Sequence, residues 1–131
     1  MKYTLLLFVL TINIAIGAKP ATSANHFFVY NNGQPGLKNK MLKVAEVKEL
    51  AQHLKKGAEL FVIVTAKPTQ GDPYYEIQVG YHDASGDDSQ YIFRLKKNYL
   101  NQSDFGPYLE IIDLQQGAYV PLADYRKTHH K

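Results

Sequence analysis

Residues 73–97, PYYEIQVGYHDASGDDSQYIFRLKK, decide the fold of this chain. On both sides of the central turn, apolar side chains occupy every second position. A period of two places alternate side chains on opposite faces of a strand, so the stretch predicts a β-hairpin with one apolar and one polar face. The apolar set is Tyr75, Ile77, Val79, Tyr81, Tyr91, Phe93 and Leu95. Because a hairpin alone is marginally stable in water, we expect the rest of the chain to cover this face.

In residues 44–56 the apolar side chains recur with the period of a helix. This segment is therefore predicted to cover the apolar face of the hairpin. Val47, Leu50, Ala51 and Leu54 recur at the spacing of one helix face, while Glu46 falls on the opposite, polar side. We therefore expect one amphipathic helix, with Leu50 and Leu54 buried against the hairpin.

Short apolar runs predict the remaining strands, at residues 26–31, 60–65, 108–114 and 118–122. The intervening segments, residues 32–39, 67–73 and 98–107, have the composition of loops. The predicted fold is α+β, with one amphipathic helix packed on a curled, mainly antiparallel sheet of four to five strands. Residues 124–131 are polar and basic, and we expect a flexible C-terminal tail there.

This order of elements resembles a known group of small exported domains. The segments VAEVKELAQHL, PYYEIQVGY and YIFRLKK follow one another as a helix and a meander, as in PepSY-like or cystatin-like domains. The resemblance covers most of residues 25–131 and is one of topology. Cystatins inhibit through a Gln-x-Val-x-Gly loop, whereas Gln78-Val79-Gly80 lacks that spacing and falls within a predicted strand. Inhibition is therefore not carried over from the resemblance.

The N-terminus has the three-part pattern of a secretory signal peptide. Lys2 precedes an apolar run over residues 5–16, which is shorter than the roughly 20 residues of a membrane-spanning helix. Small residues follow, and cleavage is expected between residues 17 and 24, with Ala24 preferred. Residues 1–24 are thus a predicted signal peptide and residues 25–131 a single domain. We expect a periplasmic or secreted protein without a membrane anchor after processing.

Composition narrows the classes of partner. The chain has 15 basic and 12 acidic side chains, and the signal peptide removes Lys2 and Lys19 but no acidic residue. The remaining domain is close to neutral, so the sequence does not predict a nucleic-acid-binding protein, which needs a clustered positive patch. Cysteine is absent, which excludes disulfides and thiol chemistry.

The polar face of the hairpin is the predicted binding site. Tyr74, Glu76, Gln78, Arg94 and Lys96 alternate away from the apolar set and should form one patch. Tyrosine and arginine are common in recognition surfaces, although ordinary cross-strand packing explains the same pattern.

The acidic turn is a candidate metal site, because Asp83, Asp87 and Asp88 could supply the oxygen ligands that calcium prefers. The Glu expected at the twelfth position of a calcium loop is replaced by Arg94, which favours a soluble hairpin turn.

The sequence contains no Gly-x-Ser-x-Gly motif, glycine-rich phosphate loop or pair of histidines at helical zinc spacing. We therefore expect no catalytic residue and no cofactor. The first hypothesis is a non-catalytic exported binding or accessory domain that recognises a protein, peptide or glycan in the envelope. An inhibitor of an envelope or extracellular hydrolase is the alternative, and a small enzyme with an unrecognised site is a third.

N-terminal sequencing tests the processing hypothesis. The exported protein should begin at Asn25, because Ala24 follows the apolar run and ends a series of small residues. A membrane-bound product that retains Met1 would contradict this prediction.

Overall fold

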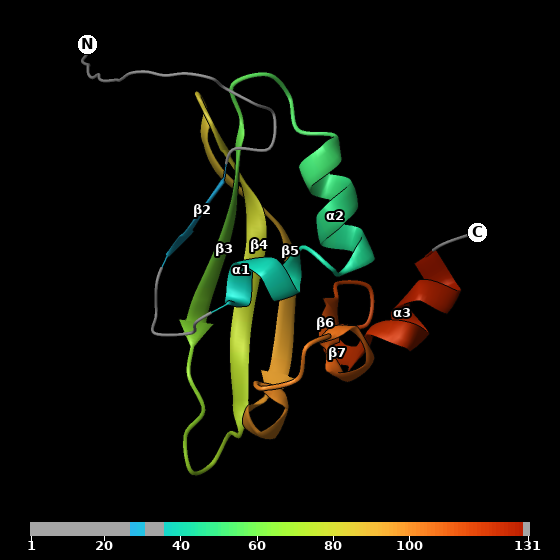
Figure 1. Ribbon diagram of the computed structural model, residues 1–131. Coiled ribbons are helices and arrows are strands. Elements are labelled where there is room, and N and C mark those ends of the chain that lie inside the picture. Colours follow the sequence, from blue (N-terminus) through green and yellow to red (C-terminus); the bar gives the residue numbers. More distant parts are fainter. Residues whose placement is uncertain (1–26, 31–35, 130–131) are drawn as a thin grey trace.

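The computed structural model describes residues 27–30 and 36–129, and its strands form one sheet in the order β2-β3-β4-β5-β6-β7 (Figure 1). The strands are β2 (Phe27–Tyr30), β3 (Glu59–Ala66), β4 (Tyr74–Asp83), β5 (Gly86–Lys96), β6 (Glu110–Asp113) and β7 (Ala118–Pro121). The helices are α1 (Leu37–Met41), α2 (Ala45–Gln52) and α3 (Leu122–His129), with single 3-10 turns at Lys97–Tyr99 and Gly106–Tyr108. The predicted signal peptide lies outside the described residues. No described helix is long and apolar enough to cross a membrane.

The predicted hairpin is confirmed. β4 and β5 pair antiparallel from Tyr74↔Lys96 to Asp83↔Gly86, and an extra residue in β5 shifts the register beside Gly80. A Cβ atom at Gly80 would lie 2.1 Å from the carbonyl oxygen of Asp88 and 2.8 Å from the ring of Phe61. Only glycine fits at this bulge, because the backbone of β5 and the ring of Phe61 leave no room for a side chain.

The α+β class is confirmed, but the expectation of one helix on a curled sheet of four to five strands is wrong in detail. The sheet has six strands in the described chain, is not strongly curled, and includes β2, which pairs parallel with β3. All three helices contribute to a core on one face of the sheet (Figure 1). The fully buried side chains of that core include Met41, Val47, Leu60, Val62, Val79, Phe93, Leu95 and Leu122.

Helix α2 covers the hairpin with a different set of residues from the predicted one. Val44, Val47 and Ala51 are buried, whereas Leu50 and Leu54 are half-buried and pack at the margin of the core. The helical spacing of the apolar residues therefore predicted the correct segment, and Val47 and Ala51 are buried as expected. It was wrong for Leu50 and Leu54, which lie at the margin of the core.

The prediction of a flexible tail over residues 124–131 is wrong as far as His129, because Leu122–His129 forms α3. Leu122 is buried, and the ring of Tyr125 stacks on that of His129 with 3.9 Å between centroids. Arg126 donates from Nε and Nη2 to the two carboxylate oxygens of Glu46, each at 2.7 Å. Glu46 was assigned to the polar side of α2, yet it is only 3% exposed. Its burial is stabilised by a cation from α3, near the other end of the chain.

Two segments interpreted as loops also enter the core. Leu37 of the segment 32–39 and Phe105 of the segment 98–107 are buried, together with Met41 and Leu109, which lie just beyond these segments. Lys40 holds the segment 98–107 by donating from Nζ to the carbonyl oxygen of Leu100 at 2.8 Å. Neither segment shows a regular apolar period, because each contributes only a few anchors from irregular backbone.

Replacing Arg126 with alanine should destabilise the fold by roughly 2–4 kcal/mol, because the carboxylate of Glu46 stays buried without its partner. Denaturant unfolding at neutral pH measures this change. Lys127→Ala, which breaks an exposed pair with Asp124, is the matched control and should cost less than about 0.5 kcal/mol. Equal effects of the two substitutions would contradict the assigned role of Glu46.

Candidate functional site

Three of the five predicted site residues meet on the sheet face opposite the core. Glu76 is the cross-strand partner of Arg94, and Tyr74 that of Lys96. Strand alternation directs these side chains away from Ile77 and Phe93, which are buried in the core on the other face. The three helices pack on that other face, so among the described elements none lies over this one. We call it the outer face.

Arg94 is the centre of the outer face. Its Nε and Nη2 donate to Oε1 of Glu110 on β6 at 2.9 and 2.7 Å. Its guanidinium carbon lies 4.1 Å from the ring centroid of Tyr74 and 4.4 Å from that of Tyr119. The cation is thus held by one carboxylate and two aromatic rings, which are the two kinds of contact that a guanidinium favours.

The two glutamates extend this cluster across five strands. Tyr74 donates its hydroxyl to Oε2 of Glu110 at 3.0 Å. Tyr119 on β7 donates to Oε2 of Glu76 at 2.9 Å, and Thr65 on β3 donates to Oε1 of the same carboxylate at 2.6 Å. We call Thr65, Tyr74, Glu76, Arg94, Glu110 and Tyr119 the outer-face cluster. Each carboxylate accepts hydrogen bonds at both oxygens, so the cluster is internally bonded and rigid.

Burial and the neighbouring carboxylates raise the pKa of both phenols. Burial, followed by the hydrogen bond to Glu76, raises the pKa of Tyr119 to about 12. The same causes, with Glu110 as the partner, raise the pKa of Tyr74. Both hydroxyls therefore stay protonated at neutral pH and act as hydrogen-bond donors. The arrangement is suited to presenting a fixed polar and aromatic surface rather than to moving protons.

The other two predicted residues lie at the margin of the cluster. Lys96 is exposed, with Nζ 5.9 Å from the ring centroid of Tyr74. Gln78 is paired across the strands with Ile63 and Ile92, in a more apolar part of the outer face. The predicted patch is therefore divided, with Tyr74, Glu76 and Arg94 in the cluster and Gln78 outside it.

Sequence reasoning missed Thr65, Glu110 and Tyr119. Glu110 alternates with the buried Leu109 and Ile111, so a period of two assigns it to the outer face. Which strand lies beside β5 is not readable from that period. The partners of Arg94 therefore depended on a topology that the sequence left open.

The carboxylates of the acidic turn do not converge on a common point, and each has its own hydrogen-bond partner. Asp83 accepts from the backbone N–H and hydroxyl of Ser85, and Asp88 from the hydroxyl of Tyr81. Asp87 lies within 2.5 Å of Nδ1 of His82. Adjacent residues of a strand point to opposite faces, so Asp87 and Asp88 diverge. Among the described residues, no three acidic or histidine side chains are placed to hold a metal ion together.

No protein-family model, characterised protein or solved structure matches this chain. The resemblance to PepSY-like and cystatin-like domains therefore stays a prediction.

Tyr119→Phe tests the cluster through its pH dependence. A raised pKa in the folded state stabilises the protein fully below the ordinary tyrosine value of 10.0, and this stabilisation is lost as pH rises toward 12. The wild type should therefore lose more stability than Tyr119→Phe between about pH 10 and pH 12, as measured by denaturant unfolding at each pH. At neutral pH the substitution should cost roughly 1–3 kcal/mol, because a bond to a charged group is removed. Tyr108→Phe, at an exposed ring, is the control and should keep the wild-type pH profile.

Proposed function

We propose that this protein is a non-catalytic exported binding or accessory domain that recognises its partner through the outer face. The observation that carries the proposal is the position of Arg94 between two tyrosine rings on a sheet face that the helices leave uncovered. The side chains of Arg94 and Glu110 are 30% and 23% exposed, so the cluster is accessible while its geometry is fixed.

Rigidity is what makes such a surface favourable for binding. Ordering a flexible side chain at an interface costs roughly 0.5–1.5 kcal/mol. The side chains of Tyr74, Glu76 and Arg94 are already held by strand pairing and hydrogen bonds. A partner that contacts them therefore loses little free energy to ordering. Tyrosine and arginine are also enriched among the residues that dominate binding energy.

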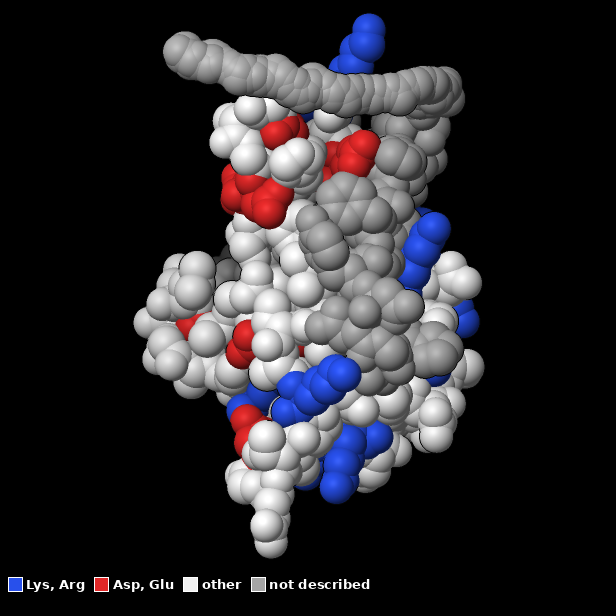
Figure 2. All heavy atoms as spheres, turned by 90° about the vertical axis from the view of Figure 1, so that its left-hand side faces the viewer, with Lys and Arg blue, Asp and Glu red and all other residues white. Residues whose placement is uncertain are grey.

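Acidic and basic side chains are separated along the hairpin, so the two ends of this surface carry opposite charge. Asp83, Asp87 and Asp88 lie at the hairpin tip, and Arg94 and Lys96 toward the other end. Figure 2 shows acidic side chains gathered toward the upper end of the molecule, where the tip lies, and more of the basic ones in the lower half. Separated charges of this kind orient a partner as it approaches.

A second candidate function, inhibition of an envelope or extracellular hydrolase, is favoured by the loop between β3 and β4. The backbone N–H of Thr69 donates to the carbonyl oxygen of Asp72 at 2.7 Å. The backbone N–H of Asp72 donates to the side-chain hydroxyl of Thr69 at 3.2 Å. Asp72 in turn accepts from the N–H of Tyr74. The loop is exposed, projects beyond the sheet and is locked by its own bonds, as a loop inserted into an active site needs to be (Figure 1).

The binding proposal is tested by capture of the partner with the tagged domain, residues 25–131, from the native envelope, followed by affinity measurement with the purified partner. Tyr74→Ala should weaken binding by roughly 1–2 kcal/mol, which is about 5- to 30-fold in Kd. Arg94→Ala is a poorer probe, because it leaves Glu110 without its cation and disturbs the fold.

Two controls make the result decisive. Tyr108→Ala removes an exposed tyrosine whose ring stacks on Tyr99 and not on Arg94, and it should leave binding unchanged. Substituting Thr69 and Gln70 with glycine in the β3–β4 loop should also leave it unchanged. Loss of binding only in the loop variant would overturn the outer-face proposal in favour of inhibition.

A further inference from the structure

Strand β5 has an edge that no other described strand covers. β6 pairs with β5 at only two positions, Phe93↔Ile111 and Arg94↔Glu110. Beyond them β6 ends at Asp113, whereas β5 continues to Gly86 and stays paired with β4. Continuing this register places Ile112 and Asp113 opposite Ile92 and Tyr91, so β5 is paired on one side only along residues 86–90. This segment is called the free edge below.

The backbone of the free edge offers hydrogen bonds to an added strand. Lys97 donates its N–H to the carbonyl oxygen of Pro73 at 2.9 Å, which directs its backbone groups toward β4. Alternate residues of an antiparallel strand direct these groups to opposite sides. Arg94 accordingly faces β6, and so does Ile92, two residues earlier. Ile92 still lies opposite Ile112 of β6. Beyond the bulge, the pairs Tyr81↔Asp88 and Asp83↔Gly86 continue the hydrogen-bonded series of β4, so the N–H and C=O of Asp87 and Ser89 point to the other side, past the end of β6.

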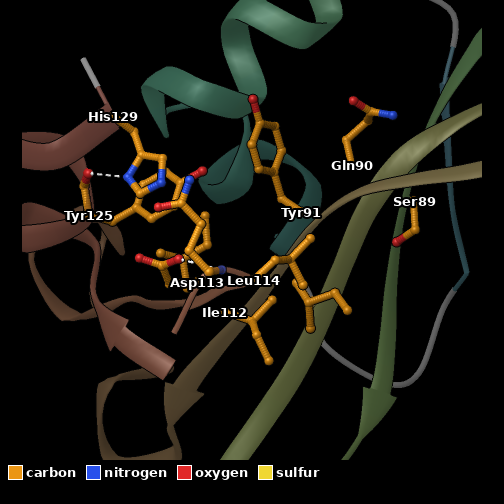
Figure 3. A pocket seen from close by; sticks show the side chains of 11 residues that line it. Ser89, Gln90, Tyr91, Ile112, Asp113, Leu114, Tyr125 and His129 are labelled. Atoms are coloured by element: carbon orange, nitrogen blue, oxygen red, sulfur yellow. Dashed lines mark hydrogen bonds between the residues drawn. The ribbon is translucent and has the colours of Figure 1, made fainter. Parts of the chain in front are cut away.

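A pocket of about 310 Å³ opens beside this edge (Figure 3). Strand β5 contributes residues 89–92, the end of β6 and its turn contribute Ile112 and Leu114, and α3 contributes Tyr125 and His129. The pocket is wide enough for one large side chain, and its walls are mainly apolar and aromatic. At its rim the side chain of Leu114 is 86% exposed, so it is available for contact with a partner.

The charge around the free edge is negative. Asp87 and Asp88 are exposed on the edge strand itself. Asp113 lines the pocket, and although burial opposes it, hydrogen bonds from Gln115 and Gln116 hold the pKa of this carboxyl below its usual value. A basic segment complements these charges. A second copy of β5 does not, because pairing two free edges would bring their aspartates together.

We propose that the free edge binds an extended segment of a partner protein, in which basic and apolar side chains alternate, and that one apolar side chain enters the pocket. The segment adds to the sheet as a further strand beside β5. Main-chain hydrogen bonds supply affinity, and the pocket and aspartates supply specificity. This site does not depend on the outer-face cluster, so it is a second binding site and not a detail of the first.

The probe is the synthetic peptide Ac-KVKFKVK-amide, which alternates as the site requires and carries one phenylalanine for the pocket. Ac-KPKFKPK-amide is the matched control, with the same charge and the same phenylalanine but without the ability to pair as a strand. Titration into the labelled full-length domain is followed by amide chemical shifts and hydrogen exchange. The first peptide should shift the amides of residues 87–90 saturably and slow exchange at Ser89 at least tenfold, and the second should do neither.

Two variants assign the contacts. Leu114→Ser should weaken binding of the first peptide about tenfold without unfolding the protein, because this side chain is already in water. Asp87→Asn combined with Asp88→Asn should weaken it by a similar factor and reduce its salt dependence. Tyr108→Ser is the control at another exposed site.

Three outcomes would overturn the proposal. Equal binding of both peptides means charge attraction without strand addition. Shifts confined to Gln78 and Lys96 place the peptide on the outer face instead. Dimerisation of the peptide-free protein, if sedimentation shows it and Leu114→Ser abolishes it, means that the edge pairs with a second copy.

Discussion

The apolar face of the β4–β5 hairpin is the constraint on which the rest of the structure depends. Ile77, Val79, Phe93 and Leu95 are fully buried, although the hairpin itself supplies nothing to cover them. The cover comes from two separate parts of the chain, with α1 and α2 between β2 and β3 and α3 after β7. All three helices are drawn to one face. The opposite face is therefore left for polar side chains, and it is there that the outer-face cluster forms.

How much of the structure could be predicted from the sequence depended on how far apart along the chain the interacting residues lie. The hairpin and α2 were predictable, because strand alternation and helical period are local patterns. The division of residues between the two faces of β4 and β5 followed from the same alternation. Arg94 could thus be assigned to the outer face, but its contacts with Glu110 and Tyr119 could not. Those contacts join strands whose order the sequence does not fix.

Helix α3 was missed for a related physical reason. It has one fully buried apolar residue, Leu122, and is otherwise polar, so no amphipathic pattern marks it. What holds it is the pair of Arg126 with Glu46, together with the ring of Tyr125 against the core. Such a helix is stabilised almost entirely by tertiary contacts, and these are absent from any local window of sequence.

The pair between Glu46 and Arg126 joins residues that are 80 positions apart, and this separation sets an order of events during synthesis. At roughly 5–20 residues per second, Arg126 is made about 4–16 s after Glu46. Until then the buried carboxylate of Glu46 lacks its two hydrogen bonds from Arg126, so α2 packs on the sheet less stably than in the complete chain. The nascent chain should consequently reach its full stability only once its last helix has emerged, at the end of translation.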